Sequence, residues 1–292
     1  MSKGFFKSEI VHDFFHDPSA VIGSVLLVVS ILLAFFAPSI APQNPYDLEK
    51  VSLEHFLTPP IWMEGGEPGF LLGTDDQGRD IFSTILYGFR TSLIVGFGVV
   101  LIAGTFGIIV GLLAGYYGGL MDTVTMRLAD TLFSFSTTLI AILLLGLFNR
   151  GGVLIVIIAI CIADWVKYAR TMRGSVLEIK EEAYITAAKA TGAGDLRLLL
   201  KHLLPNAIPP IFVIVAVDLA VVIMLEATLS FLGVGVPLTE PSLGMMISIG
   251  KNYMYAGMWW LVLFPGIALF LLVIGINLFA DWLREELNPK IE

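Results

Sequence analysis

The sequence is poor in charge. Only 14% of its 292 residues are Asp, Glu, Lys or Arg, and 57% are hydrophobic, whereas soluble domains average about 25% charged residues. A soluble fold of this length has no means of hiding so much apolar surface from water, so a lipid bilayer is the expected solvent. The net charge of −8 comes without a basic stripe, which argues against a nucleic-acid partner.

The sequence also lacks the residues of common catalytic and metal sites. Its single cysteine, Cys161, excludes an internal disulfide and any zinc site built on cysteines. No G-x-x-x-x-G-K-[ST] phosphate loop, HExxH or GxSxG motif occurs, and the 4 histidines are scattered. We therefore predict that this chain holds no catalytic residue, metal site or cofactor, and that it does not bind ATP itself.

What is present instead is a series of long apolar runs. Six are long enough to consider, at 20–37, 92–116, 132–148, 153–168, 207–233 and 258–281. Because roughly 20 apolar residues cross a bilayer, we predict an all-α integral membrane protein with six transmembrane helices. The first run has a mixed rather than basic leading flank, so we interpret it as a retained anchor, not a cleaved signal. The fourth is the weakest, since Asp164 interrupts it.

The distribution of basic residues predicts the orientation. With six spans, both termini lie on one side, and that side carries 12 of the 17 Lys and Arg residues. The other side carries Lys50, Arg79, Arg90, Arg150 and Lys251. Basic residues accumulate on the cytoplasmic side, so we predict cytoplasmic termini.

These spans divide the chain into five predicted parts. They are a cytoplasmic lead (1–18), a first transmembrane helix (19–37), an extracytoplasmic loop (38–90), a five-helix core (91–285) and a cytoplasmic tail (286–292). The loop is rich in Pro and Gly and ends in an amphipathic stretch at 81–88, which Asp75 or Asp76 is expected to cap.

Three glycines in the second run share one face of the predicted helix. Gly107, Gly111 and Gly115 are spaced by four residues. Small residues at this spacing allow two helix backbones to approach closely. We therefore expect this face to pack on a neighbouring helix rather than on lipid.

A polar segment between the fourth and fifth runs is the most distinctive part of the chain. Helix-forming residues from about 176 to 191 are followed by Gly192 and Gly194, and Asp195 is placed to cap a second helix at 196–204. Three prolines are expected to end that helix, at positions 205, 209 and 210. The small side chains of Ala187 and Ala188 suit insertion into a groove on another protein, although the helix pattern alone also fits a solvated connector.

Three polar residues inside the apolar runs are possible lining for a translocation path: Asp218, Glu226 and Asn277. A charge near the bilayer centre is costly and usually faces a cavity or a partner. Asp218 is the best lining residue by position, and a structural hydrogen-bonding role is the favoured interpretation of Glu226. Asp164 precedes a basic stretch and is expected to serve packing or to lie near the water interface.

The polar segment resembles the coupling loop of ABC importer permeases. That signature reads Glu-Ala-Ala, three residues, Gly, nine residues and Ile-x-Leu-Pro. The chain matches it at Ala187, Ala188, Gly192, Leu204 and Pro205. It departs at Thr186, which stands where the signature has Glu, and at His202, which stands where it has Ile. Glu182 opens the segment.

Further stretches extend the resemblance from about residue 20 to 290. Those at 72–81, 86–93, 114–120, 226–233 and 277–284 are similar to the second, C-type permease subunit of dipeptide, oligopeptide and nickel importers. The resemblance implies a bacterial inner-membrane subunit that pairs with a homologous permease, two P-loop ATPase subunits binding ATP and Mg, and an extracytoplasmic substrate-binding protein. It also implies that residues 170–206 form the cytoplasmic coupling segment. Dipeptides are the expected cargo.

A second hypothesis stays open on the residues alone. It is a self-sufficient, proton-coupled secondary transporter or channel, in which Asp218 and Glu226 would serve as a proton relay. Transport by the isolated chain, driven by a proton gradient and indifferent to ATP, would distinguish it from the permease.

Overall fold

The protein folds entirely into helices and connecting loops in the part of the chain that its computed structural model describes, which is residues 12, 14–47, 53–148, 152–237 and 239–287. A lone bridge between Thr74 and Asp80 is the sole β-type pairing there. The helices are α2 (Pro18–Ile40), η1 (Leu53–His55), α3 (Ile81–Tyr117), α4 (Gly119–Phe133), α5 (Thr137–Phe148), α6 (Val153–Lys180), α7 (Ala183–Ala190), α8 (Asp195–Leu198), η2 (Leu199–Leu203), α9 (Leu204–Ala207), α10 (Pro209–Phe231), α11 (Leu243–Tyr253), η3 (Met254–Ala256) and α12 (Trp260–Leu287).

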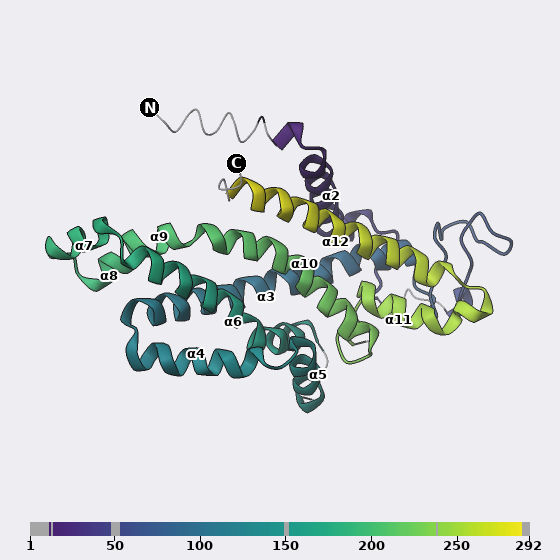
Figure 1. The fold of residues 1–292 in the computed structure, drawn as a ribbon. Helices are drawn as coiled ribbons and strands as arrows, with labels where there is room; N and C mark the ends of the chain where they lie inside the picture. The colour runs from purple at the N-terminus through teal and green to yellow at the C-terminus, as the bar shows by residue number, and fades with distance from the viewer. Residues whose placement is uncertain (1–11, 13, 48–52, 149–151, 238, 288–292) are drawn as a thin grey trace.

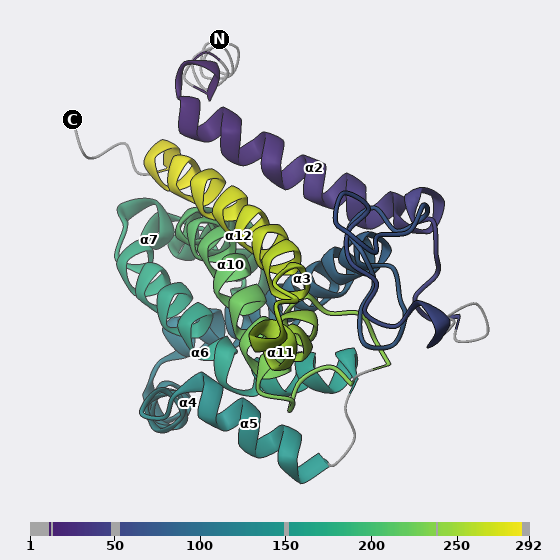
Figure 2. The same cartoon turned by 90° about the vertical axis from the view of Figure 1, so that its right-hand side faces the viewer.

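The long helices form an elongated bundle (Figure 1). The short helices α7 and α8 lie at one end, and α11 lies at the other. In both views, α2 and the α4–α5 pair lie on opposite sides of the central helices (Figure 2). Helix α2 packs along α12, and α3 packs along α6.

Glycines allow the close packing of α3 against α6. A Cβ added to Gly107 would lie 2.5 Å from the carbonyl oxygen of Trp165, and one added to Gly111 would lie 2.3 Å from that of Ala169. At Gly115 the added carbon would lie 2.9 Å from Val176 Cβ. The structure thus places all three glycines of the predicted stripe against α6, where any larger side chain would force the helices apart.

Four helices are long and apolar enough to cross a membrane, namely α2, α3, α10 and α12. The bent pair α4 and α5 brings the number to five if it counts as one span. The run at 132–148 is therefore not one straight helix: its first residues belong to α4, and α5 follows after an 87° bend. Helix α6 has 28 residues but carries Asp164, Lys167 and Arg170 in its first 18, so its composition alone does not mark it as a span.

The connection between α2 and α3 is shorter than the predicted loop at 38–90. Helix α2 continues through Pro38 to Ile40, and α3 already begins at Ile81. The predicted amphipathic stretch and the second apolar run are one helix of 37 residues, or about 55 Å at 1.5 Å per residue. Its N-cap is Asp80, whose carboxylate accepts from Ser83 N at 2.8 Å, rather than the predicted Asp75 or Asp76.

Asp75 instead forms a buried ion pair inside that connection. Its Oδ2 lies 2.7 Å from Arg79 Nε, and its Oδ1 accepts the backbone N–H groups of Gln77 and Arg79. Both side chains of the pair are almost fully buried. Burial also raises the pKa of Asp80, an effect that its hydrogen bonds to Ser83 oppose. The connection is thus folded against the start of α3.

Candidate functional site

The projecting segment, residues 181–198, forms the end of the bundle that carries α7 and α8 (Figure 1). Helix α6 stops at Lys180, so the helix expected from 176 to 191 is broken. Glu182 has an extended backbone (ψ 141°) and starts α7 as its N-cap without a side-chain hydrogen bond. Ile185 is completely buried and holds α7 to the bundle. The outward-facing side chains include Thr186 and Ala187, whereas Ala188 is half-buried.

Gly192 ends α7 as the sequence predicted. Its φ of +84° is left-handed, its N–H donates to Lys189 O at 3.0 Å, and Ala193 N donates to Ala188 O at 3.1 Å. This pair of bonds is the Schellman arrangement, which favours glycine because other residues are strained at positive φ. The segment therefore has a defined backbone shape rather than that of a loose connector.

Tyr116, at the end of α3, ties this segment to the rest of the bundle. Its hydroxyl donates to Asp195 Oδ1 at 2.6 Å, and its carbonyl oxygen accepts from Lys180 Nζ at 2.8 Å. The ammonium of Lys189 lies 5.6 Å from the centroid of the Tyr116 ring. Asp195 was predicted to cap the second helix. That prediction was wrong, because Gly194 is the N-cap of α8 and no side chain caps it.

The chain returns to the bundle through a nearly continuous helical path. Helix α8 passes into the π-helical turn η2 and then into α9, which has Leu204 and Pro205 in its first turn. Proline is tolerated in a first helical turn, where its missing N–H has no partner to lose. Pro205, Pro209 and Pro210 therefore begin helices here, whereas the sequence pattern predicted that they end one.

A buried polar cluster joins α6 to α10 about halfway along both helices. Lys167 Nζ lies 2.7 Å from Asp164 Oδ1 and also bonds to Asp218 Oδ1. The Tyr168 hydroxyl donates to Asp218 Oδ2 at 2.5 Å. The structure thus brings together Asp218, which was proposed as lining, and Asp164, which was assigned to packing. Lys167 was not singled out from the sequence.

Glu226 occupies a different environment. Its side chain is 0% exposed and accepts three hydroxyl hydrogen bonds, from Ser92 at 3.0 Å and from Ser230 and Ser242 at 2.8 Å. These bonds connect α3, α10 and the start of α11. Glu226 is therefore held as a structural junction, in line with the favoured interpretation of its role.

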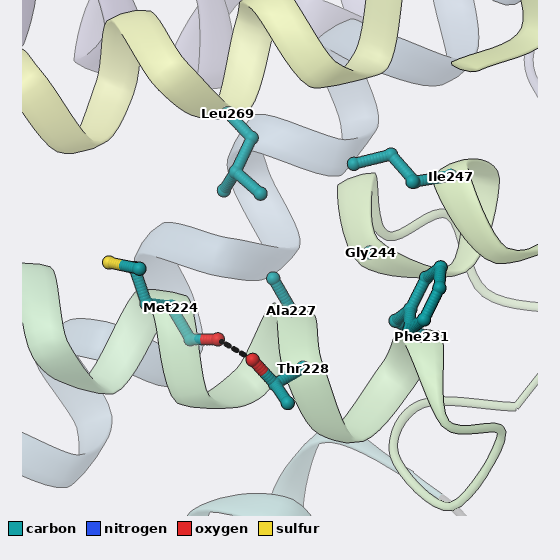
Figure 3. A pocket seen from close by; sticks show the side chains of 7 residues that line it. All are labelled: Met224, Ala227, Thr228, Phe231, Gly244, Ile247 and Leu269. Atoms are coloured by element: carbon teal, nitrogen blue, oxygen red, sulfur yellow. Dashed lines mark hydrogen bonds between the residues drawn. The ribbon is translucent and has the colours of Figure 1, made fainter.

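Asn277 is exposed on α12, among apolar side chains. It lines a pocket of about 410 Å³ with Met224 of α10 and Ile247 of α11. A neighbouring pocket of about 210 Å³ contains Met224, Ile247, Thr228 and Phe231 (Figure 3). A third, of about 360 Å³, also includes Met224 and Thr228 but reaches the polar cluster. The three pockets share Met224 and extend over α5, α6, α10, α11 and α12, and we call their combined lining the Met224 face.

Among the residues that the structure describes, no group of three or more His, Cys, Asp or Glu side chains is arranged to hold a metal ion. The residues that sequence reasoning missed are Tyr116, Lys167 and the three serines around Glu226. A lone serine or tyrosine carries no local pattern, so only the tertiary fold reveals these partners.

Two protein families match this chain. The "binding-protein-dependent transport system inner membrane component" family matches residues 107–292, and the "N-terminal TM domain of oligopeptide transport permease C" matches residues 6–60. Among curated relatives, the dipeptide transport system permease protein DppC of Haemophilus influenzae is 38% identical over 279 residues, covering 96% of this chain and 93% of that protein.

More distant proteins agree with this placement. The glutathione transport system permease protein GsiD of Pectobacterium atrosepticum is 34% identical over 282 residues, covering 96% of this chain and 89% of that protein. Among solved structures, a chain of the inward-facing MetNI methionine ABC transporter superimposes with a TM-score of 0.53, covering 70% of this chain and 96% of that chain. Its sequence identity is 20%, so this similarity supports the fold alone.

Proposed function

We propose that this chain, which belongs to the family of inner membrane components of binding-protein-dependent transport systems, is the C-type permease subunit of an ATP-driven importer of short peptides. The proposal is carried by the projecting segment, whose Schellman turn lies where the family resemblance places the coupling loop. Dipeptides are the proposed cargo, because relatives covering nearly the whole chain are named as dipeptide permeases.

The proposed topology has six spans with both termini in the cytoplasm. Helix α6 serves as the fourth span despite its charges, because Lys167 pairs with both Asp164 and Asp218 inside the protein. The bent α4–α5 pair supplies the third. The projecting segment, 181–198, then lies in the cytoplasm, and the connection between α2 and α3 lies outside.

The proposed partners are a homologous permease, two P-loop ATPase subunits and an extracytoplasmic substrate-binding protein. The Met224 face supports the first of these, because it leaves polar and apolar side chains uncovered at mid-span. ATP and Mg are bound by the ATPase subunits, and this chain is a non-catalytic component. Its residues bind a partner rather than break a bond.

In the proposed mechanism, α7 and the following turn insert into a cleft of one ATPase subunit. Closure of the ATPase pair on ATP moves this segment, and the movement passes to α3 through Tyr116 and to α6 and α10 through the chain itself. The membrane helices then alternate between inward-open and outward-open arrangements. The assembly is a two-state system whose equilibrium is biased by ligands bound elsewhere.

The test compares two proline substitutions two residues apart. Gly192→Pro removes the N–H that bonds Lys189 O and forbids the φ of +84°, whereas Gly194 has a φ of −70° that proline adopts readily. We expect Gly192→Pro to abolish ATP-dependent peptide uptake while membrane insertion stays normal, and Gly194→Pro to retain uptake. Normal transport by Gly192→Pro would reject the proposal.

Two further measurements separate the permease from the secondary transporter. A cysteine at Ala188 should crosslink to an ATPase subunit in the assembled complex. Uptake by the purified chain alone, driven by a proton gradient without ATP, would select the alternative.

A further inference from the structure

The polar cluster on α6 and α10 has more carboxyl groups than ammonium groups. Asp164 and Asp218 share a single cation, the ammonium of Lys167, and each carboxylate uses one oxygen for it. The second oxygen of Asp218 is occupied by the Tyr168 hydroxyl. The second oxygen of Asp164 is buried and accepts no hydrogen bond from any residue that the structure describes. The cluster therefore has two carboxyl groups around one ammonium, and one open acceptor, meaning an oxygen that receives no hydrogen bond.

This open acceptor belongs to a residue on the wall of a pocket. Asp164 is only 6% exposed, and with Lys167 it lines the pocket of about 360 Å³. Three hydroxyl side chains at the start of α5 line the same space: Ser136, Thr137 and Thr138. A carboxylate oxygen without a partner is costly inside a membrane protein, where a buried charge needs a counter-ion or a hydrogen bond. The pocket thus has the chemistry to receive a cationic donor.

The pocket also lies on the expected route of a solute. Met224 and Thr228 form part of its wall and part of the neighbouring pocket shown in Figure 3. Asp218 is the tenth of 23 residues in α10, so the cluster stands about midway across the helix. A solute moving along the Met224 face passes Asp164 at the depth where bulk water is least available.

We propose that this pocket is a binding site for the free ammonium group of the cargo in transit. An ammonium offers three N–H donors; one satisfies Asp164 Oδ2, and the hydroxyls of α5 accept the others. Lys167, which is 31% exposed, already pairs with both carboxylates, so the site recognises the ammonium end of the peptide. The site thus selects zwitterionic peptides over N-blocked ones. This inference rests on the proposed transport function for its cargo, but its charge is measurable without transport.

The charge of the pocket is tested by thiol chemistry in the assembled complex. Thr138→Cys is made in a Cys161→Ala background, and its reaction rates with a cationic and an anionic methanethiosulfonate reagent are compared. We expect the cation-to-anion rate ratio to exceed that of a free thiol in solution by roughly tenfold, the effect of one unit charge nearby at intermediate dielectric. Adding Asp164→Asn should return the ratio to the free-thiol value.

Asp130→Asn is the matched control. Asp130 also pairs with a basic residue of α6, Arg170, but its side chain is 55% exposed and does not line this pocket. It should leave the rate ratio unchanged. A Thr138→Cys ratio equal to that of the free thiol would overturn the proposal, as would a ratio insensitive to Asp164→Asn or a thiol that neither reagent reaches. If Asp164 and Asp218 shared a proton, the Thr138→Cys ratio would equal that of the free thiol.

Uptake measurements then separate this inference from the proposed function. In proteoliposomes with the complete complex, Asp164→Asn should transport several-fold less dialanine per ATP hydrolysed, while Asp130→Asn matches the wild type. Equal uptake by Asp164→Asn would reject the ammonium site alone. Absence of ATP-dependent uptake by the wild-type complex would reject the transport proposal, and the thiol rates would still decide the charge of the pocket. If Asp164→Asn fails to assemble, the Thr138→Cys ratio measured without it decides whether the pocket attracts cations.

Discussion

Glu226 on α10 accepts a hydrogen bond from Ser92 on α3, 134 positions earlier in the chain, at 3.0 Å. Ser230 and Ser242 complete its shell, so one carboxylate joins three segments of the bundle. Since the side chain is 0% exposed, water has no access to replace any bond that is lost. This junction holds α3, α10 and the start of α11 together.

We therefore expect Glu226→Ala to destabilise the protein by about 2–4 kcal/mol, because it leaves buried hydroxyls without an acceptor and opens a cavity. Glu226→Gln keeps the shape and one oxygen, so it should cost about 1 kcal/mol or less. Thermal unfolding in detergent measures both. Thr228→Val is the control, because the Thr228 hydroxyl bonds only its own helix, at Met224 O. An alanine variant as stable as the wild type would contradict this role.

The contact between α3 and α6 gives a second prediction. Gly111→Ala would place a carbon 2.3 Å from the backbone oxygen of Ala169, and backbone has little freedom to move. We expect a loss of about 1–3 kcal/mol in the free energy of unfolding. Gly174→Ala on α6 meets no atom within 4 Å and should be neutral or stabilising. The two variants have the same chemistry, so equal melting temperatures would show that the glycine contact does not limit stability.

The sequence determined the class of fold but not the course of each helix. Periodicity, apolar length and the glycine spacing were enough to predict an all-helical membrane protein and the turn at Gly192. The N-cap of α3 and the start of α7 were mispredicted, because Asp75 forms an ion pair with Arg79 instead of capping α3, and Ile185 is buried against the bundle. Rules for helix capping use only the sequence beside a helix end, and they do not take into account the other contacts of those side chains.

The candidate site was likewise predictable from the sequence only in part. The residues proposed for coupling lie in one stretch of sequence, so a motif was enough to propose them. The charged cluster and the Glu226 junction join residues 50 or more positions apart, such as Tyr168 with Asp218 and Ser92 with Glu226. No local pattern specifies that Lys167 points at Asp218 rather than at solvent. Such pairs require the packed structure.

The buried ion pair before α3 gives a third prediction. Arg79→Met leaves Asp75 buried without its cation, and breaking a buried pair costs about 3–5 kcal/mol. The cost is local, so the connection at 41–80 should become sensitive to protease added from outside, while the helices remain intact. Glu67→Gln removes the half-exposed pair with His55 and should cost about 1 kcal/mol or less. Equal digestion rates for the two variants would argue against the ion pair as the support of this connection.

Tyr116 offers the sharpest test of how the projecting segment is held. Its hydroxyl is the donor to Asp195, and the bond links the end of α3 to the start of α8 at 2.6 Å. Tyr116→Phe removes that bond and keeps the ring near Lys189, so the bundle should lose only about 1 kcal/mol. We expect a larger effect on coupling: peptide uptake per ATP hydrolysed should fall several-fold, because the segment would move without carrying α3.

The neighbouring tyrosine provides the control for this variant. Tyr117 is 54% exposed at the last position of α3, so Tyr117→Phe alters the same helix end by the same atom without touching Asp195. It should transport like the wild type. Asp195→Asn keeps an acceptor oxygen for Tyr116 and should retain most of the coupling, whereas Asp195→Ala should match Tyr116→Phe. If Tyr116→Phe and Asp195→Ala lowered uptake independently when combined, the two residues would not act through one bond, and α3 would receive the movement by another route.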